Sequence, residues 1–185
     1  MKEEIFKSEK LTFEERVKKD LGIKIIAFLF FSLIPLAVNR NAYNLLITIL
    51  FPLFILSVLI LITLNTTKKY IYEVRINSDE IKFYGKKYDK DWNEKFKIND
   101  IDIQIIEHKS KVGNVLGYSI IFKSPSRKVT VNKLFNWNNF TLYNLFIEFK
   151  KAKGEKIIID ENSLLTGIKK RAEYYYEWED IKNDG

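Results

Sequence analysis

Two stretches of apolar residues near the start of the chain, 25–38 and 45–64, dominate its hydrophobic pattern. The second has about 20 residues without a charge, the length that an α-helix needs to cross ~30 Å of hydrocarbon. The first reaches a similar length if it begins near Leu21 and includes Lys24, whose long stem lets its ammonium group reach water. Only a short polar bridge separates the stretches, so we expect spans over 21–38 and 45–64 that form a transmembrane hairpin within 21–65.

Two other interpretations of these stretches fit the sequence less well. A cleaved signal peptide is expected nearer the start of a chain and ends at a small-residue cleavage site, which the first stretch lacks. A hairpin buried in a soluble protein needs a larger surrounding chain to cover two helices that are apolar on all sides. The membrane hairpin is therefore the preferred interpretation.

Basic residues beside the two stretches predict the orientation of the hairpin. The bridge between the stretches carries only Arg40, whereas six basic residues flank their outer ends: Arg16, Lys18, Lys19, Lys24, Lys68 and Lys69. Because basic flanks stay on the cytoplasmic side, we expect a multi-pass protein with both termini in the cytoplasm. The chain has no cysteine, which is compatible with a reducing compartment without requiring one.

The residues before the first span, 1–20, are expected to form a cytoplasmic helix that continues into it. Thr12 and Glu15 have the spacing of a capping box, in which a hydroxyl and a carboxylate satisfy the first amides of a helix. An apolar edge recurs every four residues at Phe13, Val17 and Leu21. This edge suits a helix lying at the membrane surface or a simple extension of the span, and the sequence leaves both open.

From Tyr70 onward the pattern changes, and apolar residues alternate with polar ones as expected for half-buried strands. Turn-forming residues at 77–79, 99–100 and 124–126 separate the alternating segments. Short antiparallel strands with brief connections are typical of a small barrel or sandwich. We therefore expect an antiparallel β domain over 66–160, with a last strand allowed at 156–160.

A helical period appears after these strands, over 139–153. Four apolar residues lie at positions i, i+3, i+4 and i+7, namely Leu142, Leu145, Phe146 and Phe149. Gly154 provides a residue suited to the end of this helix. Because one apolar-faced helix follows a run of strands, we expect it to cap an open end of the barrel. A second amphipathic helix with an acidic tail is expected over 161–185.

This order of elements resembles the bacterial pleckstrin-homology-like membrane proteins. The likeness rests on the strand 70–76 after the membrane, the segment 92–101 and the helix 142–149. It implies an α+β membrane protein, in which a two-helix hairpin precedes a PH-like barrel with a binding or scaffolding role at the bacterial inner membrane. Phosphoinositide binding is not implied, because the loop that supplies basic ligands in that superfamily is here Asn77-Ser78-Asp79.

Residues suited to catalysis are scarce in this chain. It has one histidine, His108, and no cysteine, which removes most nucleophilic and zinc arrangements. It also has no glycine-rich phosphate-binding loop. Asp89 and Asp91 are close in sequence, but the lysines around them favour a solvated turn over a metal site. We expect no enzymatic activity, no cofactor and no metal.

The net charge of +7 includes a set of lysines in two loops: Lys86, Lys87, Lys90, Lys109 and Lys111. In an up-and-down order of strands both loops return toward the membrane, where each cation near anionic headgroups contributes ~1 kcal/mol. The alternative is a general excess of lysine on the cytoplasmic side. The expected partners are the bilayer and its anionic headgroups, a protein or a second copy in a homo-oligomer. Nucleic acid is not expected, because the aromatic residues fit strand interiors.

Three functions are compatible with this organisation. The first is a non-enzymatic binding or scaffolding module presented at the cytoplasmic face of the inner membrane. The second is an immunity protein against a membrane-active toxin. The third is a defence effector whose barrel binds a cyclic nucleotide and whose helices then disrupt the membrane. A barrel filled by the 142–149 helix favours the first function, and a barrel with a polar pocket favours the third.

Overall fold

The structure, a computed structural model, describes residues 3–38 and 45–183, with side chains described except at 23, 27, 29–38, 45–49 and 175–183. The chain forms two compact units. One comprises 1–10, 70–86 and 90–185, and the other comprises 11–69 and 87–89. The first twenty residues, expected to form one helix, are therefore divided between the units.

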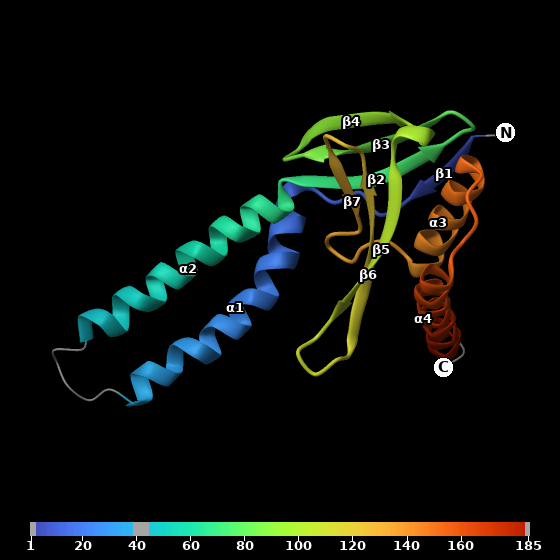
Figure 1. Ribbon diagram of the computed structural model, residues 1–185. Coiled ribbons are helices and arrows are strands. Elements are labelled where there is room, and N and C mark those ends of the chain that lie inside the picture. The colour runs from blue at the N-terminus through green and yellow to red at the C-terminus, as the bar shows by residue number, and fades with distance from the viewer. Residues whose placement is uncertain (1–2, 39–44, 184–185) are drawn as a thin grey trace. The chain divides into compact units, whose positions relative to one another are not determined.

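The second unit is built on two helices, α1 (Phe13–Val38) and α2 (Leu45–Thr67), which contact each other (Figure 1). The predicted capping box at the start of α1 is confirmed. The Glu15 amide donates to Thr12 Oγ1 at 3.2 Å, and the Thr12 amide donates to Glu15 Oε2 at 2.7 Å. The bond from the Thr12 amide lowers the pKa of the Glu15 carboxyl. The predicted bridge, 39–44, lies outside the described residues.

A short strand, β1 (Glu4–Lys7), precedes α1 in the chain. It pairs antiparallel with β2 (Lys69–Ile76), which follows α2, and its Phe6 side chain is buried. The prediction of a helix over 1–20 is thus wrong for its first part. Four residues carry too little periodicity to reveal a strand, and the partner that satisfies their backbone groups lies more than sixty residues away.

The strands form two antiparallel sheets in the part of the chain that the structure describes, in the orders β1-β2-β3-β4 and β5-β6-β7. No strand of one sheet is hydrogen-bonded to the other among these residues, so the predicted closed barrel is wrong and the predicted sandwich describes the domain better. The turn expected at 99–100 lies in a 3-10 helix, η2 (Ile98–Asp100), that leads from one sheet to the other. The remaining strands are β3 (Glu80–Lys87), β4 (Lys90–Lys97), β5 (Asp102–Lys109), β6 (Val115–Lys123) and β7 (Lys128–Val131).

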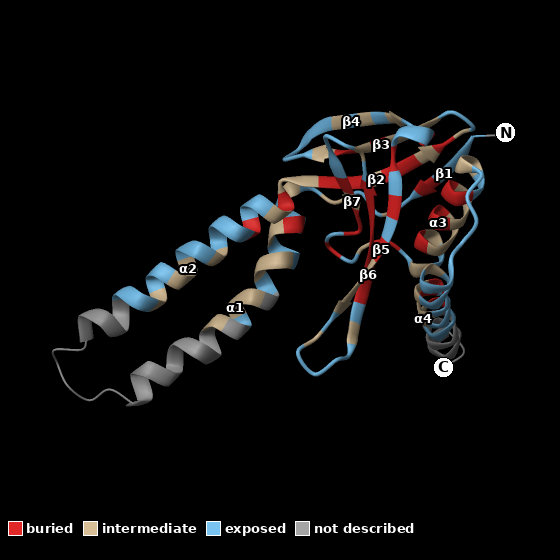
Figure 2. Ribbon diagram, in the orientation of Figure 1, coloured by how far each residue is buried: buried red, intermediate tan, exposed pale blue. Residues whose placement is uncertain are grey.

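Both sheets share one apolar core with α3 (Asn139–Lys153) and α4 (Ile159–Asn183) (Figure 2). The Phe83 ring of β3 meets the Phe122 ring of β6 edge-on, with centroids 4.9 Å apart. Phe122 in turn meets Phe149 of α3 at 5.3 Å. Helix α3 spans the residues predicted for it. Asn138 caps its start, and Gly154, at φ 72°, ends it in the left-handed conformation that glycine accepts without strain.

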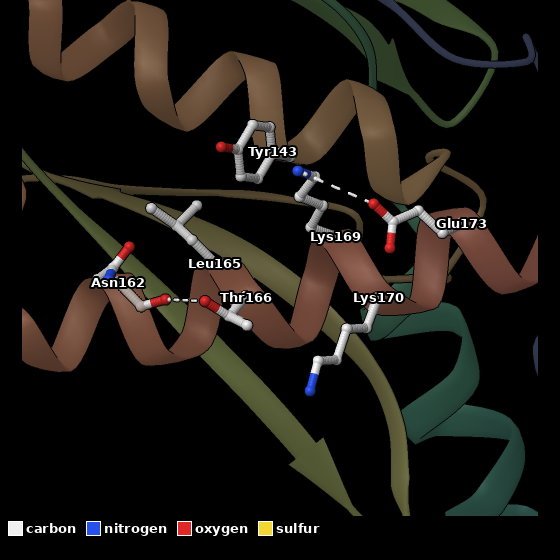
Figure 3. A pocket seen from close by; sticks show the side chains of 7 residues that line it. All are labelled: Tyr143, Asn162, Leu165, Thr166, Lys169, Lys170 and Glu173. Atoms are coloured by element: carbon white, nitrogen blue, oxygen red, sulfur yellow. Dashed lines mark hydrogen bonds and ion pairs between the residues drawn. The ribbon is translucent and has the colours of Figure 1, made fainter.

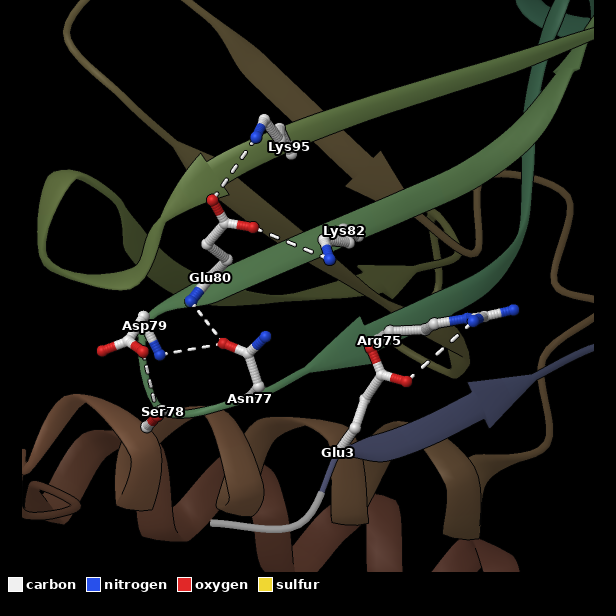
Figure 4. Close-up of polar contacts among 8 residues, drawn as sticks. All are labelled: Glu3, Arg75, Asn77, Ser78, Asp79, Glu80, Lys82 and Lys95. Atoms are coloured by element: carbon white, nitrogen blue, oxygen red, sulfur yellow. Dashed lines mark hydrogen bonds and ion pairs between the residues drawn. The ribbon is translucent and has the colours of Figure 1, made fainter.

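The β2–β3 turn uses its own polar groups to close (Figure 4). The Asn77 Oδ1 atom accepts hydrogen bonds from the amides of Asp79 and Glu80, at 2.9 and 2.7 Å. The Glu80 carboxylate then lies 3.7 Å from Lys82 Nζ and 3.4 Å from Lys95 Nζ. This turn therefore presents an acidic and amide surface, and both lysines beside it are paired with Glu80.

Candidate functional site

An apolar surface runs along α2. Within the described residues, one helical segment, Leu50–Thr67, is long and apolar enough to cross a membrane. Large apolar side chains in it are exposed: Leu50, Phe51, Leu53, Phe54, Val58, Ile60, Leu61, Ile62 and Leu64. The first predicted span, 21–38, lies in α1, where side chains from residue 29 onward are not described. The structure thus supports one span, and it does not support the predicted multi-pass topology.

Arg16 joins three segments of the second unit at the base of the helices. Its side chain is fully buried, and its Nε donates to the Thr67 carbonyl at 3.1 Å, at the end of α2. Its Nη1 donates to the Leu11 carbonyl at 2.7 Å, and its Nη2 donates to the Tyr88 carbonyl at 2.6 Å. The planar guanidinium suits this role, because it carries donors in several fixed directions.

The turn between β3 and β4, residues 87–89, completes this joint. The Tyr88 amide donates to the Lys68 carbonyl at 2.6 Å, and the Phe13 amide donates to Asp89 Oδ1 at 2.8 Å. The rings of Phe13 and Tyr88 meet edge-on at 5.2 Å. Tyr88 adopts φ 54°, a conformation that side chains other than glycine rarely accept, so the surrounding contacts must hold it. The joint therefore links the two helices to the 87–89 turn within this unit.

In the sequence, Arg16 is one of six basic residues that flank the apolar stretches, and its position there does not indicate a role as a joint. Its three acceptors lie 5, 51 and 72 residues away in the chain. Local spacing cannot indicate the two distant partners, whereas the capping box and the apolar edge beside Arg16 did indicate that this turn of helix is ordered.

The predicted lysines lie on two hairpins. Lys86 of β3 lies 2.9 Å from Asp91, and hydrogen bonding to this lysine lowers the pKa of that carboxyl. Lys109 of β5 lies 2.7 Å from Glu107 and lowers the pKa of its carboxyl in the same way. The other three, Lys87, Lys90 and Lys111, have exposed side chains.

These five lysines are divided between the two units. Lys87 belongs to the unit that contains the helices. In the other unit, the tip of the β5–β6 hairpin projects well away from the ends of β3 and β4 that carry Lys86 and Lys90 (Figure 1). Within the β domain, Lys109 and Lys111 are therefore separate from Lys86 and Lys90.

The apolar residues predicted on the 142–149 helix lie inside the β domain. Leu142, Leu145, Phe146 and Phe149 are fully buried in the core shared by the two sheets. The expectation that this helix caps an open barrel end is replaced by packing into a sandwich. The interior that a bound small molecule would occupy in a barrel is filled here by side chains of α3 and both sheets.

A shallow groove of about 300 Å³ lies between α3 and α4 (Figure 3). Tyr143 of α3 lines one wall, and residues of α4 line the other. Thr166 donates to the Asn162 carbonyl at 2.8 Å, and Lys169 lies 3.9 Å from Glu173. The polar groups of the groove thus bond within α4, which leaves it without converging groups that would define a ligand.

The single histidine is hydrogen-bonded to a serine. His108 Nε2 lies 2.8 Å from Ser119 Oγ, and the His108 ring meets Phe135 edge-on at 5.2 Å. A nucleophilic serine must reach a substrate, whereas the Ser119 side chain is buried in β6. This pair therefore fits a structural contact between two strands. No cluster of metal-ligating side chains occurs within the residues described.

Ion pairs connect the end of α3 to α4 and β5. Lys150 is almost buried, with Nζ 2.9 Å from Glu155 and 2.8 Å from Glu161. Lys153 lies 2.7 Å from Asp102 of β5. Burial by itself would lower the pKa of Lys150, but its hydrogen bonds to Glu161 and Glu155 more than offset this, and its pKa is raised. The charged form of Lys150 is thus favoured in the folded protein.

These ion pairs predict a pH dependence of stability. Hydrogen bonds from Lys153 and Lys150 hold the pKa of Glu155 below its ordinary value of 4.5. A lowered pKa stabilises the fold above the ordinary value, and this stabilisation is lost as pH falls through the folded-state value. We expect the Tm of the protein in detergent to fall below pH 4.5, and less so in Glu155→Gln. Melts followed by circular dichroism measure this, with Glu173→Gln as the control. Parallel Tm profiles for the protein and Glu155→Gln would contradict it.

No protein-family model, no curated protein and no solved structure matches this chain significantly.

Proposed function

We propose that this protein is a membrane-anchored, non-enzymatic binding or scaffolding module. In this proposal α1 and α2 cross the bacterial inner membrane as a two-span hairpin, and both termini lie in the cytoplasm. The β domain, similar in role to a PH-like domain, is presented at the cytoplasmic face to a protein, to lipid headgroups or to a second copy.

The pairing of β1 with β2 is the observation that supports the two-span topology. These strands bracket the two helices in the chain and belong to one sheet, so both lie on the same side of any membrane. The chain between them must then cross an even number of times. If α2 crosses the membrane, α1 must cross it in the opposite direction. The 26 residues of α1 extend over about 39 Å at 1.5 Å per residue. That length is sufficient for the hydrocarbon core.

The filled interior of the β domain supports binding at its surface. A cyclic-nucleotide effector needs an interior cavity lined with polar groups, whereas α3 places four fully buried apolar side chains in this region. A sandwich closed by an apolar helix leaves loops and edges for recognition. Partner binding by the surface is therefore favoured over gating by an enclosed ligand.

Cysteine labelling tests the topology, because the protein has no cysteine of its own. We place single cysteines at Asn41 in the bridge, at Glu9 before α1 and at Ser126 in the β6–β7 turn. An impermeant thiol reagent is expected to label only Asn41→Cys on intact cells. Glu9→Cys and Ser126→Cys are expected to react only after the membrane is permeabilised.

Each alternative topology gives a different labelling pattern. Labelling of Ser126→Cys without Asn41→Cys on intact cells would show the inverted orientation. Opposite behaviour of Glu9→Cys and Ser126→Cys would show a single span and contradict the two-span proposal. Recovery of all three variants in the soluble fraction would exclude a membrane anchor.

A further inference from the structure

The tip of the β5–β6 hairpin, residues 109–116, combines exposed apolar and basic side chains. Val112 is 81% exposed and Leu116 is 54% exposed. Lys109 and Lys111, which precede Val112 in the chain, are also exposed. A single exposed valine is ordinary on a protein surface, but two exposed apolar side chains beside two lysines at the end of one hairpin form a defined amphipathic element.

Hydrogen bonds within the turn hold Val112 at the tip. The Ser110 amide donates to the Asn114 carbonyl at 2.8 Å, and the Gly113 amide donates back to the Ser110 carbonyl at 3.0 Å. The Asn114 amide also donates to Ser110 Oγ at 3.1 Å. Gly113 has φ 86°, a conformation that a residue with a side chain would rarely adopt. The exposure of Val112 thus results from a specific turn.

Two contacts outside the turn brace the hairpin. Arg171 of α4 donates to the Val115 carbonyl at 2.6 Å and to the Leu116 carbonyl at 3.2 Å. Phe135 covers Gly117 so closely that a Cβ atom there would lie 2.7 Å from its ring. Phe135 is itself exposed at 46%. The hairpin is thus held outward from the β domain, ready to contact a partner.

We propose that this hairpin docks on an anionic bilayer, with Val112 inserted at the level of the headgroups and Lys109 and Lys111 beside lipid phosphates. This inference rests on the proposed membrane anchoring through α2. Lysine is depleted from the cores of protein–protein interfaces. An apolar tip beside lysines instead matches the surface of an anionic bilayer, where negatively charged headgroups cover an apolar interior. The long aliphatic stems of lysine also let its ammonium group reach lipid phosphates while Val112 enters the bilayer.

The chain supplies a matched control site at the opposite end of the same strand. Strand β6 has nine residues, so its two ends lie about 26 Å apart at 3.3 Å per residue. Ser126, in the β6–β7 turn at the far end, is exposed. Lys123 and Lys128 lie at this end and match the charge of Lys109 and Lys111.

The test uses the full chain reconstituted into vesicles, with single cysteines labelled by nitrobenzoxadiazole. Reporters are placed at Val112, Ser126 and Phe54, whose side chain is exposed on α2. Lipids with a nitroxide near the headgroup or along the chain quench a reporter that enters the bilayer. The vesicles contain phosphatidylglycerol mixed with phosphatidylcholine, or phosphatidylcholine alone.

We expect the Val112 reporter to shift to shorter wavelength and to be quenched by the shallow nitroxide in anionic vesicles, while the Ser126 reporter stays unquenched. The double substitution of Lys109→Gln and Lys111→Gln removes both positive charges, and it is expected to reduce quenching at Val112 about twofold. The matched pair Lys123→Gln and Lys128→Gln is expected to leave it unchanged. Quenching at Val112 is also expected to be weaker in phosphatidylcholine alone.

The outcomes separate failure of this inference from failure of the anchor. Quenching at Phe54 with none at Val112 would overturn hairpin docking alone. No quenching at Phe54 would overturn both the anchoring and the docking. Equal quenching at Val112 and Ser126, or equal effects of the two lysine pairs, would overturn the assignment of docking to this hairpin.

Discussion

Replacing Phe146 with alanine is expected to lower the free energy of unfolding by about 3–5 kcal/mol. Phe146 is fully buried on α3, in the core that both sheets share. Its removal deletes apolar contacts and leaves a cavity that surrounding strands can close only partly. Since natural domains are stable by only about 5–15 kcal/mol, this loss is expected to unfold much of the protein at moderate temperature.

The effect is measured on the full chain in detergent. Near-ultraviolet circular dichroism during heating reports the packing of Trp137, which is buried in the same core. The matched control is Phe140→Ala, on the same helix at an exposed position, with an expected effect of about 0.5 kcal/mol or less. Equal melting of Phe146→Ala and Phe140→Ala would show that α3 is not needed for the core.

Replacing Arg16 with alanine is expected to cost on the order of 3 kcal/mol and to release the 87–89 turn from the helices. Three backbone carbonyls lose their charged donor at once, and water can replace it only where the emptied space is large enough. Arg16→Lys is expected to recover only part of this loss. An ammonium group cannot reproduce the planar arrangement of donors that meets Leu11, Thr67 and Tyr88.

Chymotrypsin cleavage after Tyr88 measures release of the turn, alongside thermal unfolding in detergent. We expect faster cleavage in Arg16→Ala than in Lys19→Ala, which changes an exposed cation on the same helix. The order of Tm is expected to be parent and Lys19→Ala highest, then Arg16→Lys, then Arg16→Ala. Cleavage and melting of Arg16→Ala that match those of Lys19→Ala would contradict the role of Arg16 as a joint.

Local pattern was sufficient for elements whose stability comes from neighbours in the chain. The bonds between Thr12 and Glu15 join residues three apart, so their spacing predicted the start of α1. The four apolar residues of α3 share one helical face, and Gly154 ends the helix in the conformation expected of it. The five candidate lysines were expected in two loops, whereas four of them lie at strand ends and only Lys111 lies in a turn. The sequence also did not indicate which of these lysines have acidic neighbours in space.

The sequence by itself determined one apolar helix long enough to cross a membrane, the alternating strands and the apolar face of α3, because these depend on periodicity within a segment. Only the tertiary structure decided how the segments combine. The pairing of β1 with β2 and the bonds from Arg16 to the Thr67 and Tyr88 carbonyls join residues far apart in the chain. The hydrogen bonds between such segments leave no repeating pattern in the sequence, because each donor meets its acceptor only when the whole chain is packed.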